Sequence, residues 1–298
     1  HIMGQLVHLS ETAHEPVVDM RSEEAPSPLE TPYIQRGSSW RAGLTISEGC
    51  NRQCAFCVVP LTRGKERVRC STDILSEVKE LAAKGYVEIM LLGQTVNSYR
   101  ERSAEGVNFA ELLRRIAAIE GIRRIRFTSP HPGDFSDELL NVMVSCPAVC
   151  NQIHLPVQSG STKILKAMRR GYTREGYLEI IEKIHRAARP LAISTDLIVG
   201  FPGETESDFQ DTLSLLDAVQ YDSVFSFKYS PRPHTVALGF PDEIPEEEKG
   251  RRLDILQRKQ KLIQYSRNEA YLEQQFEVLV EGNARNRLRL AGRLTNNK

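Results

Sequence analysis

The sequence predicts an incomplete α/β barrel of six strand–helix units, followed by the beginning of a small β domain. Six short apolar runs with the character of strands recur between residues 43 and 228. Amphipathic stretches of helical length separate these runs. Strands that alternate with helices form a parallel sheet with right-handed crossovers. Six such units fit a curved relative of the eight-stranded barrel better than a doubly wound sheet.

The elements of this barrel follow one another along the chain. Strands are expected over residues 43–47, 88–92, 124–128, 152–155, 192–199 and 223–228. Helices are expected over residues 72–84, 108–119, 137–145, 161–169, 174–188 and 206–219.

The flanking segments give the expected domain boundaries. Residues 1–3 are interpreted as a tag remnant, and the rest of residues 1–40 as an acidic, proline-rich linker with one strand candidate near residues 5–9. A sequence that begins with a linker suggests that a further part of the protein precedes the linker. The barrel is expected over residues 41–245 and a connecting helix over residues 246–275. Strands at 276–280 and 290–294 would begin the small β domain, and two strands are too few to complete it.

Composition excludes several classes of protein. The 39 Lys and Arg residues balance the 39 Asp and Glu residues, so a nucleic-acid partner must be argued from local patches rather than from bulk charge. No apolar run reaches the roughly 18–20 residues that a bilayer-spanning helix needs, so no membrane association is expected. The chain shows no signal-peptide pattern. We therefore expect a cytoplasmic protein.

Three of the six cysteines form the strongest chemical signal. Cys50, Cys54 and Cys57 follow the first strand within eight residues. Thiolates at this spacing can bind three corners of one 4Fe–4S cubane, and with no fourth cysteine nearby one iron would be open to a non-protein ligand. The alternative is a structural zinc site completed by a distant histidine or by Cys70, although zinc sites usually show paired C-x-x-C motifs. The remaining two cysteines, at positions 146 and 150, are expected to pack in the core.

Polar turns follow the other strands. Residues 93–97, 129–132, 156–161, 200–205 and 230–233 carry amide, hydroxyl or carboxylate groups together with Gly and Pro. Because the carboxyl ends of barrel strands meet at one mouth, these groups would suit a polar cofactor that lies over the cluster.

Two basic segments are candidates for contact with RNA. Arg63, Lys65, Arg67 and Arg69 lie beside the cysteine loop, and Arg285, Arg287 and Arg289 lie near the end of the chain. Arginine and lysine bind phosphates, and arginine also stacks on unpaired bases. The alternative for either segment is a solvated charged surface.

The cysteine loop after a strand, within a six-unit barrel, resembles the radical S-adenosylmethionine (SAM) superfamily. A longer series of strings resembles the methylthiotransferase family, and within it the branch that acts on tRNA: CVVPLTRGKER, LLGQTVNSY, FTSPHP, HLPVQSGS, MRRGYTRE, STDLIVGFPGET and FKYSPRP. The resemblance covers about residues 41–298.

The resemblance implies a cofactor site. Cys50, Cys54 and Cys57 would ligate a 4Fe–4S cluster whose open iron binds SAM. An electron from a reductant such as flavodoxin or ferredoxin would then cleave SAM to methionine and a 5′-deoxyadenosyl radical. The implied contacts to SAM are Gly93 and Gln94 at the methionine part, Ser129 and Asp196 at the ribose or methionine part, and Phe56, Val199, Gly200, Tyr229 and Ser230 around the adenine.

The resemblance also implies a substrate, the isopentenylated adenosine on the 3′ side of a tRNA anticodon. A methylthio group would replace the hydrogen on C2 of its adenine, with the methyl group from a second SAM. The family's N-terminal domain, with three cysteines for an auxiliary 4Fe–4S cluster, is missing here, and its C-terminal RNA-binding TRAM domain begins only near residue 276. This chain alone is therefore expected to bind one cluster and cleave SAM.

Two alternatives remain open. A RimO-type methylthiotransferase would modify an aspartate of a ribosomal protein. A third branch of the family modifies threonylcarbamoyl-adenosine in tRNA, and the string LLGQTVNSY argues against it. A protein of another class would be a non-catalytic module with a structural zinc ion or an electron-transfer cluster.

Overall fold

The computed structural model describes residues 36–101, 106–284 and 289–298. Its strands are β1 (Arg41–Thr45), β2 (Ser47–Glu48), β3 (Arg67–Val68), β4 (Glu88–Leu92), β5 (Arg124–Phe127), β6 (Gln152–His154), β7 (Ala192–Val199), β8 (Ser223–Lys228), β9 (Leu279–Asn283) and β10 (Leu290–Arg293). Its α-helices are α2 (Val59–Arg63), α3 (Ser71–Ala83), α4 (Phe109–Ala117), α5 (Asp137–Ser145), α6 (Thr162–Ala167), α7 (Arg174–His185), α8 (Glu206–Val219) and α9 (Glu246–Glu269). The strand expected near residues 5–9 lies outside the described residues.

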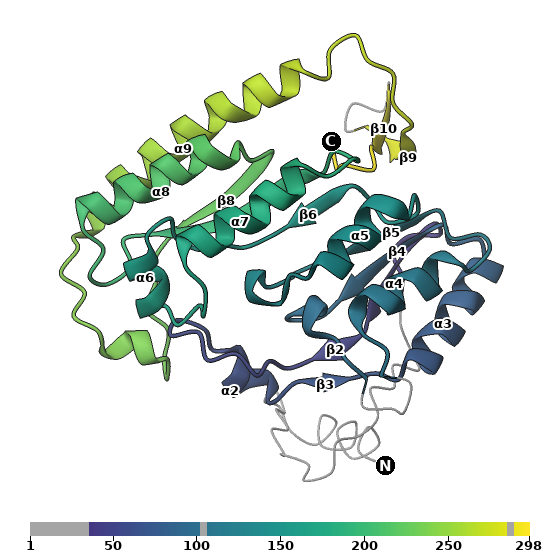
Figure 1. Cartoon of the computed structure of the whole chain (residues 1–298), viewed down its shortest axis with the longest axis horizontal. Coiled ribbons are helices and arrows are strands. Elements are labelled where there is room, and N and C mark those ends of the chain that lie inside the picture. Colours follow the sequence, from purple (N-terminus) through teal and green to yellow (C-terminus); the bar gives the residue numbers. More distant parts are fainter. Residues whose placement is uncertain (1–35, 102–105, 285–288) are drawn as a thin grey trace, which may run out of the picture. The chain divides into compact units, whose positions relative to one another are not determined.

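Six parallel strands form the sheet that the sequence predicts. Strands β1, β4 and β5 pair in that order, and β6, β7 and β8 form a second parallel set. A parallel bridge between Ile125 and Val149 connects the two sets. Helices alternate with these strands along the chain (Figure 1). The expected fold class, a partial α/β barrel, is confirmed.

The first strand begins and ends two residues earlier than the sequence suggested. Residues 41–45 pair with β4, whereas Ser47 and Glu48 leave that sheet and pair antiparallel with Val68 and Arg67 of β3. This two-stranded pair and helix α2 were not predicted, because two-residue strands and a five-residue helix carry too little periodic signal.

Local capping explains where several helices begin. The Ser136 and Ser161 side chains accept hydrogen bonds from the third backbone N–H of α5 and α6. Thr205 and Asp208 form a reciprocal capping box at the start of α8. Each cap satisfies a backbone donor that the helix itself leaves unpaired, and typically stabilises by about 1 kcal/mol.

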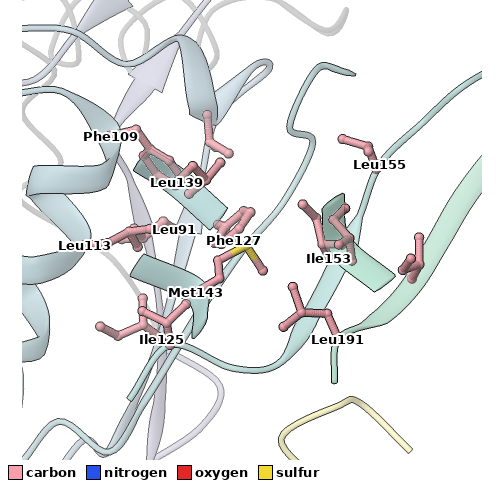
Figure 2. Packing of buried hydrophobic residues seen from close by; sticks show 14 of the residues in the cluster. Leu91, Phe109, Leu113, Ile125, Phe127, Leu139, Met143, Ile153, Leu155 and Leu191 are labelled. Carbon is pink, nitrogen blue, oxygen red and sulfur yellow. The ribbon is translucent and has the colours of Figure 1, made fainter. Parts of the chain in front are cut away.

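The apolar core lies between the barrel strands and their helices. Figure 2 shows side chains of β4 and β5, including Leu91 and Ile125, converging with Leu113 and Met143 of the covering helices. All four side chains are completely buried. Full burial of one such side chain stabilises the fold by about 1.5–3 kcal/mol.

The inner face of the barrel is polar instead. Arg126, Gln152, His154 and Ser194 line a cavity of about 520 Å³. Closed eight-stranded barrels fill this space with layers of branched apolar side chains. The open cavity here leaves room for a polar ligand in the middle of the fold.

The last part of the chain closes the amino-terminal end of the barrel strands. The guanidinium groups of Arg124 and Arg126 donate hydrogen bonds to the carbonyls of Arg293 and Leu294, both at 2.8 Å. The Glu88 carboxylate, fully buried, accepts from Arg126 at 3.3 Å and from Arg293 at 3.2 Å. The opposite end of the strands therefore remains for the cysteine loop and the polar turns.

The connecting helix is shorter than predicted. Helix α9 ends at Glu269 rather than at residue 275. Its amphipathic pattern continues beyond that point, but Tyr271 is held by contacts outside the helix. The Tyr271 hydroxyl accepts a hydrogen bond from Asn296 at 2.9 Å, and its ring lies 5.4 Å from that of Phe276. Tertiary contact thus overrides helix propensity here.

Strands β9 and β10 pair antiparallel. Strand β9 begins three residues later than expected, whereas β10 begins at the expected residue and ends one residue earlier. That they begin an RNA-binding domain stays a prediction. In the part of the chain that the structure describes, no helix has the length and apolar character needed to cross a bilayer.

Candidate metal centre

The cysteine loop is fixed by backbone hydrogen bonds to three separate parts of the fold. The Cys50 N–H donates to the Gly64 carbonyl at 3.1 Å, and the Ala55 N–H donates to the Met168 carbonyl at 3.0 Å. The Ala55 carbonyl accepts from the N–H of Ala237 at 2.8 Å. The shape of the loop is therefore supported by contacts within the chain itself.

All three thiols of this loop are free and half-buried. Cys50 Sγ lies 3.6 Å from the Thr95 hydroxyl, and Cys54 Sγ accepts a hydrogen bond from Arg170 at 3.3 Å. Burial raises the pKa of the Cys57 thiol, and charges on Cys54 and Cys50 raise it further. Mutual repulsion between the three thiolates is relieved when a cationic group binds them.

The arrangement fits a cubane better than a single ion. Within residues 36–101, 106–284 and 289–298, no three His, Cys, Asp or Glu side chains converge closely enough to hold one metal ion. Zinc needs its ligands around one point, whereas the three thiolates of a cubane each bond a different iron. Cys70 is exposed and directly precedes α3. The zinc alternative that uses Cys70 therefore has no geometric support.

The turn after β4 lies beside the cysteine loop. A Cβ atom on Gly93 would come within 2.5 Å of Ser47 Oγ, so only glycine allows this approach. Gln94 is half-buried, and Thr95 contacts Cys50. Ser47 Oγ is buried and has no hydrogen-bond partner in the described residues. Ser47 thus offers an unpaired hydroxyl beside the Gly93 turn.

Ser129 lines the cavity in the barrel, and Asp196 lies beside it, against the lining residue His154. Asp196 Oδ1 is 3.2 Å from His154 Nε2, while His154 Nδ1 lies 3.0 Å from the Ser194 hydroxyl. Ser129, at a φ of +53°, lines the same cavity as His154 and Phe225. From the sequence, His154 is more readily interpreted as a structural histidine than as a contact to a cofactor, because its place between Asp196 and Ser194 depends on the register of β6 against β7.

The residues expected around an adenine are only partly brought together. The ring of Phe201 lies 6.4 Å from that of Phe56 and 5.1 Å from that of Tyr229. The side chain of Val199 is fully buried in the core, and Tyr229 is also buried. Ser230 is exposed, and Gly200 has a φ of +70° at the end of β7. Among the residues expected around the adenine, Phe56 lies on the cysteine loop and has a half-buried side chain.

The basic residues beside the loop differ in their surroundings. Arg69 donates to the Thr45 carbonyl at 3.0 Å and pairs with Glu77 at 2.9 Å. Arg67 pairs with Glu48 at 3.2 Å. Arg63 and Lys65 are exposed. Of this segment, Arg63 and Lys65 are thus better placed to meet a phosphate backbone than Arg69.

At the end of the chain, Arg289 is exposed, whereas Arg285 and Arg287 lie outside the described residues. Arg293, which follows them, turns toward Glu88 and Glu281. The positive charge of Arg293 is therefore paired with carboxylates of the protein itself.

Arg170 is a residue of the site that sequence reasoning missed. It follows Arg169 in the string MRRGYTRE, and no spacing rule distinguishes the two. Arg169 is exposed, whereas Arg170 is buried beside Cys54. Only the fold reveals which of the two arginines turns inward.

Gly49 provides a test of the loop's shape. It has a φ of +73°, and an added Cβ would overlap the backbone carbonyls of Lys65 and Gly64. We expect Gly49→Ala to lower iron uptake at least several-fold and to lower the thermal midpoint. Gly64→Ala is the control, since Gly64 has a φ of +71° with open space around it. That variant should lose only about 1–3 kcal/mol of stability and keep its iron, and equal losses of iron in both would contradict the prediction.

The comparisons with known proteins agree with this geometry. The sequence model of the radical SAM superfamily matches residues 44–216, from β1 into α8. Among solved structures, the radical SAM methyltransferase TsrM from Kitasatospora setae is similar in fold, with a TM-score of 0.53 and 20% identity over 65% of this chain and 38% of that one. The chain therefore belongs to the radical SAM superfamily.

Its relatives define the family more narrowly. Several relatives are named tRNA-2-methylthio-N(6)-dimethylallyladenosine synthase. The one from Solibacter usitatus is 53% identical over 91% of this chain and 61% of its own length. The one from Koribacter versatilis is 47% identical over 99% of this chain and 67% of its own length. A third, from Moorella thermoacetica, is 45% identical over 99% of this chain and 67% of the relative. Within the superfamily, the chain is a member of the methylthiotransferase family, as its motifs predicted. It spans about 61–67% of the length of these curated relatives.

Proposed function

We propose that this chain is the catalytic core of a cytoplasmic radical SAM tRNA methylthiotransferase. The enzyme adds a methylthio group to C2 of the isopentenylated adenosine on the 3′ side of the anticodon. One observation carries the proposal: three half-buried thiols gather on a preformed loop at the mouth of a polar barrel, in a chain about half identical to synthases of that name. The proposal excludes a purely structural zinc module, because the thiols do not converge on one point.

Cys50, Cys54 and Cys57 would hold the 4Fe–4S cluster. When bound, the cluster and SAM supply a 5′-deoxyadenosyl radical, which can remove a hydrogen atom from an aromatic C–H that has no acidic proton at neutral pH. The protein's task is then to bind, to orient and to exclude water. A second, auxiliary 4Fe–4S cluster is expected only in the full-length protein.

We assign the contacts to SAM from the position of each residue relative to the cysteine loop and the cavity. The Gly93–Gln94 turn and the unpaired Ser47 hydroxyl lie beside the cysteine loop and suit the polar methionine part. Ser129, at the cavity, and Asp196, beside it, suit the ribose hydroxyls. The backbone of Val199 and Gly200, with Phe56, Tyr229 and Ser230, would border the adenine.

Water is excluded on one side by a small apolar cluster under the cysteine loop. Ala55 of the loop packs with Ile164, Met168 and Phe201, each at most 1% exposed. A dry environment strengthens the electrostatic contacts inside the site and protects a reactive species from side reactions. The cluster therefore both supports the loop and keeps its inner side dry.

The partner is proposed to be the anticodon stem-loop of tRNA. Exposed Arg63 and Lys65 beside the cysteine loop would contact phosphates near the reacting base, and Arg289, with Arg285 and Arg287, would contact the backbone further away. A reductant such as flavodoxin or ferredoxin would deliver the electron.

A two-stage experiment tests the function. Anaerobic reconstitution of this chain should give a brown protein with four irons, which forms 5′-deoxyadenosine from SAM and dithionite. The full-length enzyme is then given isopentenylated tRNA and, separately, a ribosomal-protein peptide, with mass spectrometry of both. A methylthio nucleoside supports the proposal, whereas product on the peptide alone would favour the RimO-type alternative. A colourless zinc protein would refute the radical mechanism.

A further inference from the structure

Arg170 is a buried cation that contacts one of the three thiols. It lies in the loop after α6, and only 8% of its surface is exposed. Its Nη1 atom donates a hydrogen bond to Cys54 Sγ at 3.3 Å. The adjacent Arg169 points to solvent. A guanidinium is expensive to bury, so its partners must account for its position.

Those partners fix the guanidinium in one orientation. Nη2 donates to the Pro156 carbonyl at 3.1 Å, and Nε donates to the Tyr172 hydroxyl at 2.9 Å. The Tyr172 hydroxyl is itself anchored to the carbonyls of Pro156 and Val157, at 3.1 and 3.0 Å. Because the fork of arginine is planar and rigid, two fixed bonds determine where the third must point. That direction is toward Cys54.

Among the residues that the structure describes, no carboxylate pairs with the charge of Arg170. Within the described residues, the polar groups that face its guanidinium are Tyr172, Cys54 and backbone carbonyls. A buried cation of this kind is stabilised when an anion lies against it. When Cys54 is a thiolate, it is that anion.

The same segment also holds the backbone of the cysteine loop. The Met168 carbonyl accepts the Ala55 N–H at 3.0 Å, one residue after Cys54. Segment 168–170 therefore forms hydrogen bonds with both the backbone and one sulfur of the cysteine loop.

We propose that Arg170 is a positioning residue for the cluster, whose N–H···S hydrogen bond orients the Cys54 thiolate and raises the reduction potential of the bound 4Fe–4S cluster. The inference rests on the proposed function, since it requires the three cysteines to hold the cluster. Reduction adds negative charge to the cluster, and a hydrogen bond with a positive charge at one thiolate favours the reduced form. The residue would thus ease the electron transfer on which SAM cleavage depends.

Substitution at Arg170 tests the potential directly. Arg170→Gln removes the charge, and at a fixed applied potential we expect its reduced-to-oxidised ratio to fall about tenfold, or about 59 mV for one electron. Arg170→Lys keeps the charge and should recover part of this shift. Arg169→Gln is the matched control, because it removes the same charge from the neighbouring exposed position. The midpoint is measured by EPR-monitored titration after the iron content has been determined. Equal midpoints for wild type and Arg170→Gln would overturn the inference.

A second measurement does not depend on whether the Arg170→Gln variant folds. The wild-type chain is prepared with ¹⁵N-guanidino arginine, and the reduced cluster is examined by pulsed EPR. We expect a ¹⁵N coupling that disappears in labelled Arg170→Lys, and its absence from the wild type would overturn the inference even if Arg170→Gln fails to fold. Failure of the proposed function would look different: the wild type itself would take up no iron or form no 5′-deoxyadenosine.

Discussion

Replacing Cys54 with alanine is expected to abolish both cluster binding and SAM cleavage. Cys54 is the middle cysteine of the loop, and its sulfur is the one that Arg170 contacts. With two thiolates left, the cubane loses a corner that no other cysteine can supply, because Cys70 is exposed and the cysteines at 146 and 150 lie outside the loop. Iron per chain and 5′-deoxyadenosine formed under anaerobic conditions measure the two effects.

The matched control for this variant is Cys70→Ala. It removes a thiol from the same region of the chain, but from an exposed position before α3. It should retain the full iron content and full SAM cleavage. Turnover retained in Cys54→Ala would show that the loop is not the ligand set, and the tRNA proposal would lose its basis.

The largest loss of stability is expected from Glu88→Gln. The Glu88 carboxylate is fully buried and accepts hydrogen bonds from Arg126 and Arg293. Glutamine keeps the volume but leaves two guanidinium groups without their shared anion. Removing one partner of a buried ion pair typically costs about 3–5 kcal/mol. Urea unfolding of the purified apo chain measures the change.

Asp254→Asn is the control for this prediction. Asp254 faces Arg258 across 3.8 Å on the exposed surface of α9, and both side chains are more than half exposed. A solvated pair of this kind is worth about 0–1 kcal/mol, so its loss should be small. Equal destabilisation in the two variants would show that the buried network at the amino-terminal end of the strands adds nothing beyond an ordinary surface pair.

Much of the barrel could be predicted from sequence because local and global signals agree. Strands β4, β7 and β8 and helices α5 and α8 have the predicted bounds. Their apolar periodicity is flanked by turn residues, and the caps Ser136 and Thr205 mark where two helices begin. The cysteine spacing predicts a metal centre for a similar reason, since all of its proposed ligands lie in one short loop.

The remainder depended on contacts between distant parts of the chain. Tyr271 ends α9 early because it is held by Asn296, and no local pattern encodes that contact. Arg69 was grouped with the RNA-binding candidates, yet it turns toward Glu77. Arg170 and His154 joined the site only through the packing of α6 and the register of β6. Charge and spacing identify such residues as functional candidates, but not the direction in which they point.

The cavity in the barrel reaches from Ser129 and His154 to Arg293 and Asn296. The last turns of the chain therefore serve as its floor. Any force that lifts β9 and β10, such as an RNA pulling on them, would open a second entrance for water opposite the cysteine loop. Under the proposed function, the hydrogen bond between Arg293 and Glu88 would therefore help to keep water from entering the cavity from below.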